Sequence, residues 1–158
     1  MIRKTYLGSI KISILKIVNE YINSPYNGGK TKIMKIRKED IPVTMQAPNT
    51  IMRAIPDCGG MTLGFNELPK GTDFTPLLQG LDNDSCHCPH WGYVLEGKIK
   101  LIYDTGKEET VGAGEVYYWP AGHTAIVQED VKMLEFSPTK ELNEVMTHVG
   151  KKMAEMGG

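Results

Sequence analysis

The sequence is poor in cysteine, with Cys58, Cys86 and Cys88 as its only three thiols. Their number is odd, and Cys86 and Cys88 are too close along the chain to close a useful disulfide loop. The composition therefore excludes a small secreted scaffold held together by disulfides. It favours a reducing, cytoplasmic setting instead.

An excess of charge of either sign is also missing. Eighteen basic and nineteen acidic residues leave a formal net charge of −1. No stretch gathers lysine and arginine along one face between aromatic residues, so nucleic acid is not an expected partner. Lys11 and Lys16 interrupt what would have to be the apolar core of a signal peptide. Neither secretion nor a membrane partner is therefore expected.

Length and composition indicate a single domain. A chain of 158 residues that is 41% hydrophobic can fill one core and is too short for two independent domains. We expect residues 1–33 to form an N-terminal extension, 34–136 a barrel, and 137–158 a C-terminal helix and tail. Apolar residues at helical spacing between Ile14 and Ile22 predict a short amphipathic helix in the extension, for packing or for a dimer contact.

From residue 34 onward, short apolar runs are separated by Gly, Pro, Asn and Asp. Their even spacing predicts an all-β sandwich or barrel. Alternation places Met61, Leu63 and Phe65 on one face, which we expect to line an interior. The long connection 69–85 is expected to form a rim or lid. The predicted strands are 50–56, 60–68, 91–96, 98–104, 108–111, 115–119, 124–128 and 131–136.

A C-terminal helix is predicted to begin near Ser137, an N-cap residue, with Pro138 at the first helical position. His148 lies off the apolar stripe of this helix and is expected to face solvent. The stripe is expected to pack on the barrel or on a partner subunit. It consists of Leu142, Val145, Met146, Val149 and Met153.

Histidine is scarce but clustered: three of the four histidines lie in the stretches 86–90 and 120–123, each joined to a predicted strand. The first stretch is Cys86-His87-Cys88-Pro89-His90, and the second ends at His123. Imidazole and thiolate are the soft or borderline donors that bind transition metals. The pattern therefore indicates one polar site at the entrances of two strands.

The same stretches carry a family resemblance. The second signature of the cupin superfamily has Gly, five residues, Pro-x-Gly, two residues and His, and it fits at Gly114, Pro120 and Gly122. The end of the first signature fits at 93–97, which closes on Gly97. The chain thus resembles a small single-domain cupin. This resemblance implies a double-stranded β-helix, or jelly-roll, barrel that often pairs into homodimers through its faces.

At the metal-ligand positions of the cupin signatures, this chain has residues that differ from those of the family. Counting back from Gly97 puts His90 where the family has Glu, and it puts Cys86 and Asp84 at the two signature histidines. In the second signature Ala125 stands at the histidine position, and His123 lies two residues earlier. Strand alternation would keep 123 and 125 on one face. It would also group residues 84, 86, 88 and 90 and exclude His87, although Pro89 weakens that exclusion.

The candidate metal ligands are therefore His90, His123, Cys86 and Cys88, with Asp84 and His87 left open. The metal expected is a divalent transition metal such as zinc, iron, nickel or manganese. A metal-dependent enzyme acting on a small organic acid or phenol would use this site for oxygenase, isomerase or decarboxylase chemistry. In the alternative, the histidines hydrogen-bond in a metal-free pocket that binds or senses a small ligand. A third reading makes the barrel only an assembly unit.

The strand after His90 carries a second feature. If His90, Gly92 and Val94 face inward, then Trp91 and Tyr93, together with Leu95, face outward and need cover from the terminal helix or a second subunit. We therefore expect a homodimer. Gly92 beside His90 is consistent with an open ligand cavity and equally with close strand packing.

Overall fold

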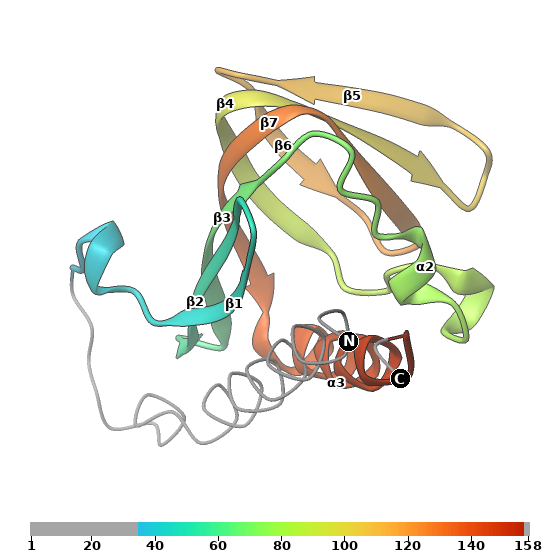
Figure 1. Ribbon diagram of the computed structural model, residues 1–158, viewed down its shortest axis with the longest axis horizontal. Coiled ribbons are helices and arrows are strands. Elements are labelled where there is room, and N and C mark those ends of the chain that lie inside the picture. The colour runs from blue at the N-terminus through green and yellow to red at the C-terminus, as the bar shows by residue number, and fades with distance from the viewer. Residues whose placement is uncertain (1–34, 157–158) are drawn as a thin grey trace, which may run out of the picture.

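The computed structural model of the chain describes residues 35–156, so the helix predicted within residues 1–33 lies outside the described part (Figure 1). The two α-helices are α2 (Thr75–Leu78) and α3 (Thr139–Met156), and short 3-10 turns cover Lys38–Asp40 (η2) and Asp82–Asp84 (η3). No described helix has the length and apolar character needed to cross a membrane. The strands are β1 (Val43–Ala47), β2 (Thr50–Cys58), β3 (Met61–Leu68), β4 (His90–Tyr103), β5 (Glu108–Gly112), β6 (Val116–Trp119) and β7 (His123–Pro138).

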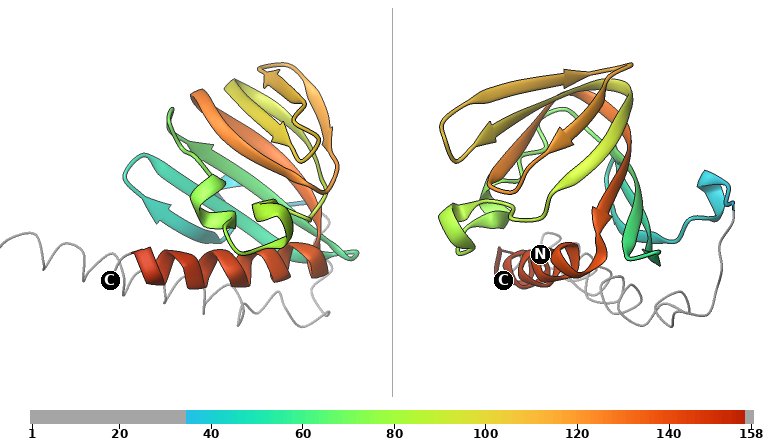
Figure 2. Two further views of the ribbon diagram at one scale, coloured as in Figure 1. Left: turned by 90° about the vertical axis from the view of Figure 1, so that its right-hand side faces the viewer. Right: turned by 180° about the vertical axis from the view of Figure 1, so that it is seen from behind.

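The strands form one antiparallel sheet in the order β1-β2-β3-β7-β4-β5, with β6 paired to the first residues of β4. The long strands β4 and β7 curl, so that β1 to β3 and β4 to β6 form two walls of a barrel (Figures 1 and 2). Helix α3 runs beneath the open end of this barrel (Figure 2). The prediction of an all-β jelly-roll barrel with a C-terminal helix is confirmed.

Two pairs of predicted strands are continuous in the structure. The runs 91–96 and 98–104 form the single strand β4, and the runs 124–128 and 131–136 form β7. Gly97 has φ +80° within β4, and a Cβ atom there would overlap the carbonyl group of Asp130. The glycine is therefore needed for an irregularity inside a strand, where its register shifts, and it does not end the strand.

The face of β3 with Leu63 and Phe65, expected to line an interior, faces an apolar cluster on the outside of the barrel. Phe65 packs in a separate cluster with Ile41 and Ile55. The opposite face, with Thr62 and Asn66, lines the interior, and both of these polar residues are buried. Both faces of β3 are therefore covered, and alternation alone could not show which of them lines the barrel.

The helix begins two residues later than predicted. Ser137 and Pro138 extend β7 and pair with Thr62 and Met61 of β3, and α3 starts at Thr139. The apolar stripe of α3 packs on its own chain, so it needs no partner subunit. Val145 and Val149 of the stripe contact a cluster that contains Leu78, Cys86 and Cys88.

Candidate metal centre

Three of the four predicted ligands form one compact cluster. The Sγ atom of Cys86 and one ring nitrogen each of His90 and His123 lie within 4.8 Å of one another, and all three residues are buried. The distance from Cys86 Sγ to His90 Nε2 is 3.4 Å. His90 is the first residue of β4 and His123 the first of β7. Cys86 lies in the loop after η3.

Backbone contacts hold the Cys86 loop against the start of β7. The Cys86 N–H donates to the carbonyl oxygen of His123 at 2.8 Å, and the Gly122 N–H donates to the Cys86 carbonyl at 2.8 Å. These bonds fix a segment that belongs to no strand. The cluster of Cys86, His90 and His123 therefore has a defined shape before any ligand is considered.

The two histidines are oriented by hydrogen bonds on the same ring atom. His123 Nδ1 lies 2.6 Å from the carbonyl oxygen of Pro120, which can only accept, so Nδ1 carries the proton. His90 Nδ1 lies 2.7 Å from Ser137 Oγ and 3.4 Å from Glu135 Oε1. With the Ser137 hydroxyl donating to Glu135, His90 Nδ1–H donates to Ser137. Both imidazoles thus keep the Nε2 lone pair free for the cluster.

Burial sets the charge of the cluster. It lowers the pKa of His90 to about 4, and burial together with the neighbouring His90 lowers the pKa of His123 to about 4. Burial raises the pKa of the Cys86 thiol to about 12. At neutral pH the three side chains are therefore two neutral imidazoles and one thiol.

Sequence reasoning missed the groups behind His90. Glu135 and Ser137 lie on β7 with their side chains directed inward, and Glu135 accepts a hydrogen bond of 3.1 Å from the hydroxyl group of Tyr117. Burial raises the pKa of Glu135 to about 7, against the opposing effect of hydrogen bonds from Tyr117 and Ser137. The signal was in the sequence, because Glu135 continues the alternation of the buried residues Val131 and Met133.

Cys88, the fourth predicted ligand, lies apart from the cluster. It is fully buried, and its Sγ atom contacts the carbonyl oxygen of Pro89 at 3.4 Å. Burial raises the pKa of its thiol. Its surroundings are the apolar side chains under α3, including Leu78 and Val145. Cys88 therefore behaves in the structure as a small apolar residue.

The two residues left open also lie outside the cluster. Asp84 is exposed and accepts a hydrogen bond of 2.7 Å from the Gly80 N–H. His87 is partly exposed, with Nε2 3.8 Å from Glu144 Oε2. The alternation that grouped residues 84 to 90 was wrong because residues 85–89 form no strand. His148 bonds the Gln79 carbonyl on the surface, as its place off the stripe predicted.

The cluster lines a cavity of about 270 Å³, here called the inner cavity. Its lining is mostly apolar, with Phe74 and Met133 among its residues. His123 and Ala125 both face it, as predicted from strand alternation. Gly92 adds no space to it, because a Cβ atom there would overlap the ring of Tyr117. The arrangement is that of a small-molecule site, with a few polar groups in an apolar pocket.

No protein-family model matches the chain, and no curated protein matches it. Among solved structures, the polyketide cyclase RemF from Streptomyces resistomycificus matches with 22% identity and a TM-score of 0.49, over 68% of this chain and 80% of the cyclase. A protein of unknown function from Rhizobium leguminosarum matches with 21% identity and a TM-score of 0.49, over 68% of this chain and 96% of the other.

Oxalate decarboxylase from Bacillus subtilis matches with 15% identity and a TM-score of 0.49. The match covers 73% of this chain and 32% of the decarboxylase, so the chain spans about a third of that enzyme. At such identities and scores these likenesses carry no information about activity. The cupin-like barrel is recognised from the two sequence motifs and the observed strand order, and function must be argued from the cluster itself.

Proposed function

We propose that this chain is a metal-binding cupin in which Cys86, His90 and His123 hold one divalent transition metal ion, and that it acts on a small organic molecule in the inner cavity. The observation that supports this best is the orientation of the two imidazoles. Each Nδ1 is engaged outside the cluster, which leaves each Nε2 as an acceptor, and that of His90 lies beside the Cys86 thiol. Metal-binding histidines are commonly oriented by a hydrogen bond of this kind.

The donor set fits such an ion. Ligand atoms around tetrahedral zinc lie about 3.3–3.6 Å apart, as Zn–N and Zn–S bond lengths of ~2.0–2.3 Å require. The 3.4 Å between Cys86 and His90 already meets this, and the limit of 4.8 Å for the whole group leaves only a small adjustment for His123. Zinc, iron, nickel and manganese are the candidates, and the thiolate favours the softer ions among them.

A bound ion would act as a Lewis acid on a substrate oxygen or on water. The protein's own residues supply the rest. Ser137 and Glu135 hold the ring of His90, and Tyr117 in turn holds Glu135. The apolar lining excludes bulk water and so strengthens the polar interactions at the site. Oxygenase, isomerase and decarboxylase chemistry all remain open to such a site.

Elemental mass spectrometry tests the metal. The protein is purified without a metal-affinity tag, supplemented with zinc, iron, nickel or manganese, and compared with the variants His90→Ala and His123→Ala. We expect about one equivalent of metal in the wild type and none in either variant. His148→Ala, which changes a surface histidine, is the matched control and should keep the metal. Metal retained in both site variants would overturn the proposal.

The second candidate is a metal-free module that binds or senses a small ligand. It is favoured by one observation, that the cluster is electrically neutral in the absence of a cation because the Cys86 thiol has a pKa of about 12. In that case no metal would be found after supplementation. A metabolite would instead raise the melting temperature, and a chelator would not change it.

The proposal includes a homodimer. Six large apolar side chains are exposed on the outer face of β4, β6 and β7, and α3 does not cover them because it packs elsewhere. Trp91 lies opposite Tyr118 on β6 and opposite Phe136 on β7, so the patch is continuous. Such a patch on a sheet face commonly marks an interface. Light scattering should show a dimer that Trp91→Arg converts to a monomer.

A cytoplasmic location is also part of the proposal. All three cysteines are free thiols, and Cys58 is exposed. Cys86 can donate to a metal only while it is reduced. A reducing compartment would keep the Cys86 thiol in the form that the proposed site requires, and it would keep the exposed Cys58 thiol free as well.

A further inference from the structure

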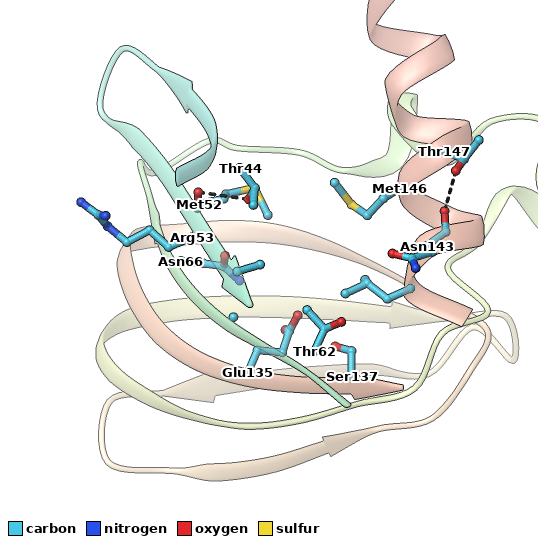
Figure 3. A pocket seen from close by; sticks show the side chains of 13 residues that line it. Thr44, Met52, Arg53, Thr62, Asn66, Glu135, Ser137, Asn143, Met146 and Thr147 are labelled. Carbon is cyan, nitrogen blue, oxygen red and sulfur yellow. Dashed lines mark hydrogen bonds between the residues drawn. The ribbon is translucent and has the colours of Figure 1, made fainter. Parts of the chain in front are cut away.

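A second cavity, here called the outer cavity, lies between the inner faces of β2 and β3 and helix α3 (Figure 3). Its volume is about 440 Å³, within the range of roughly 300–1,000 Å³ that is typical of small-ligand sites. The two cavities adjoin, since five residues line both of them. These residues are Met52, Asn66, Glu135, Leu142 and Met146.

The floor of the outer cavity is open because of a glycine. Gly64 lies directly opposite Glu135 in the β3–β7 register, and Asn66 lies on the same inward face of β3. A Cβ atom on Gly64 would make ordinary contacts of 3.7–3.8 Å, so its surroundings have room for a larger side chain. The glycine therefore keeps the space between Asn66 and Glu135 open.

Asn66 has hydrogen-bonding capacity that the protein does not use. The residue is only 7% exposed, and among the described residues no hydrogen bond joins its side-chain amide to another group. Its amide atoms are not among the fully buried polar atoms without a partner, so they remain accessible from the cavity and are candidates for ligand recognition. Figure 3 shows the Asn66 side chain on the same wall as Glu135, facing the side chains of α3 across the cavity.

The charges of the outer cavity disfavour an anionic ligand. Among the described residues that line it, Glu135 is the only acidic one and Arg53 the only basic one. The guanidinium group of Arg53 donates to the carbonyl oxygens of Ile41 and Glu39 at 2.8 and 3.5 Å, and Figure 3 shows it pointing away from Asn66. In the metal-free protein, a carboxylate ligand would thus meet the carboxyl group of Glu135 without a compensating cation from the described lining.

We infer that the outer cavity binds a neutral, mostly apolar organic molecule through a hydroxyl group, which donates to Glu135 and bonds the amide of Asn66. The apolar body of the molecule lies against Met52, Leu142 and Met146 and reaches the inner cavity between them. The inference deepens the proposed function, on which it rests for the chemistry that follows binding. Of the two substrate classes that the sequence suggested, it selects a phenol over an organic acid.

Three probes of matched shape test this: 1-naphthol, naphthalene and 1-naphthoate, each titrated by equilibrium dialysis into full-length protein that has been freed of metal with a chelator. We expect 1-naphthol to bind at least tenfold more tightly than 1-naphthoate. Asn66→Leu should weaken 1-naphthol about fivefold to tenfold, the effect of one neutral hydrogen bond, and leave naphthalene within about twofold. Gly64→Val should weaken both neutral probes, because it fills the floor.

Gln46→Leu is the matched control, since it makes the same kind of change on the exposed part of β1 and should alter no affinity. Equal binding of 1-naphthoate, no binding of 1-naphthol, or an unchanged 1-naphthol affinity in Asn66→Leu would each overturn the inference. Because the assay contains no metal, it is independent of the metal analysis. Selective 1-naphthol binding by a protein that takes up no metal would refute the metal proposal alone.

Discussion

The two halves of strand β4 lie in very different surroundings, although the strand is continuous. Beyond Gly97, the inward residues Ile99 and Leu101 are almost fully buried in an apolar core with Val127 of β7, and only Ile99 of these three reaches the wall of the inner cavity. Before Gly97, the inward residue His90 lies beside His123 and Glu135, also buried but polar, next to two cavities. We call these regions the closed half and the open half of the barrel.

The comparison separates the residues that stabilise the barrel from the residues that form its candidate binding site. In the closed half Ile99 and Leu101 are apolar, so their burial stabilises the fold directly. In the open half buried imidazole, carboxyl, hydroxyl and amide groups have lost water, and their hydrogen bonds offset this only in part. A polar cluster that gives so little stability is more readily explained by the ligand it binds.

The largest expected contrast is in stability. Leu101→Ala in the closed half should lower the free energy of unfolding by about 3 kcal/mol, since it removes a fully buried side chain and leaves a cavity. Asn66→Leu in the open half should leave that free energy unchanged or raise it by up to about 1 kcal/mol, because it replaces a mostly buried amide that no protein group bonds by an apolar side chain. Urea denaturation of both variants would measure the two effects.

Opposite signs for these two variants would establish the distinction between the halves. If Asn66→Leu instead destabilised the protein as much as Leu101→Ala, the amide would have to be part of the folded core. The proposed ligand site would then lose its main residue. The comparison should be made in metal-free protein, so that binding does not contribute to stability.

A second effect concerns the support of His90. Ser137→Ala should weaken metal binding about tenfold to a hundredfold, because it removes the hydroxyl group that orients the ring through Nδ1. Thr147→Ala, whose hydroxyl bonds a carbonyl of its own helix, should not change the affinity. Competition with a chromophoric chelator measures both. A normal affinity in Ser137→Ala would show that Glu135 alone orients His90.

The third effect is the pH dependence of metal affinity. The Cys86 thiol, with a pKa of about 12, must release its proton on binding, whereas His90 and His123, with pKa values of about 4, are already neutral. Protons therefore compete with the metal at one group only, and affinity should rise about tenfold per pH unit between about pH 6.5 and 8.5. Isothermal titration at several pH values would show it, and a flat profile would exclude Cys86 as a ligand.

The sequence was sufficient to predict the barrel and most of the cluster of Cys86, His90 and His123. Strand periodicity does not depend on distant contacts, and the two cupin-like motifs mark where β4 and β7 begin. His90 and His123 were predicted from the clustering of histidines at these strand entrances, and the structure places both beside Cys86. Residues at strand entrances are predictable because the strand fixes where they lie.

Other parts of the site depend on packing that a sequence pattern does not show. Cys86 and Cys88 look equivalent in sequence, but the loop that carries them follows no regular alternation, so only the folded chain separates them. Glu135 was overlooked because its importance comes from His90, which is far away in sequence. Asn66 was not singled out, because both faces of β3 are buried and alternation does not show which of them lines the barrel.

The smallest expected effect comes from Cys88. The sequence predicted it as a ligand, and in the structure it lies beside the cluster. Cys88→Ala should change metal affinity less than about threefold and lower stability by about 1 kcal/mol, since its thiol is packed among apolar side chains under α3. Cys86→Ala should abolish high-affinity binding, although the two positions are only two residues apart. Parallel metal titrations of the two variants compare them directly. Equal losses would mean that the loop rearranges to bring both thiols to the metal, and the open half would then be less rigid than its hydrogen bonds indicate.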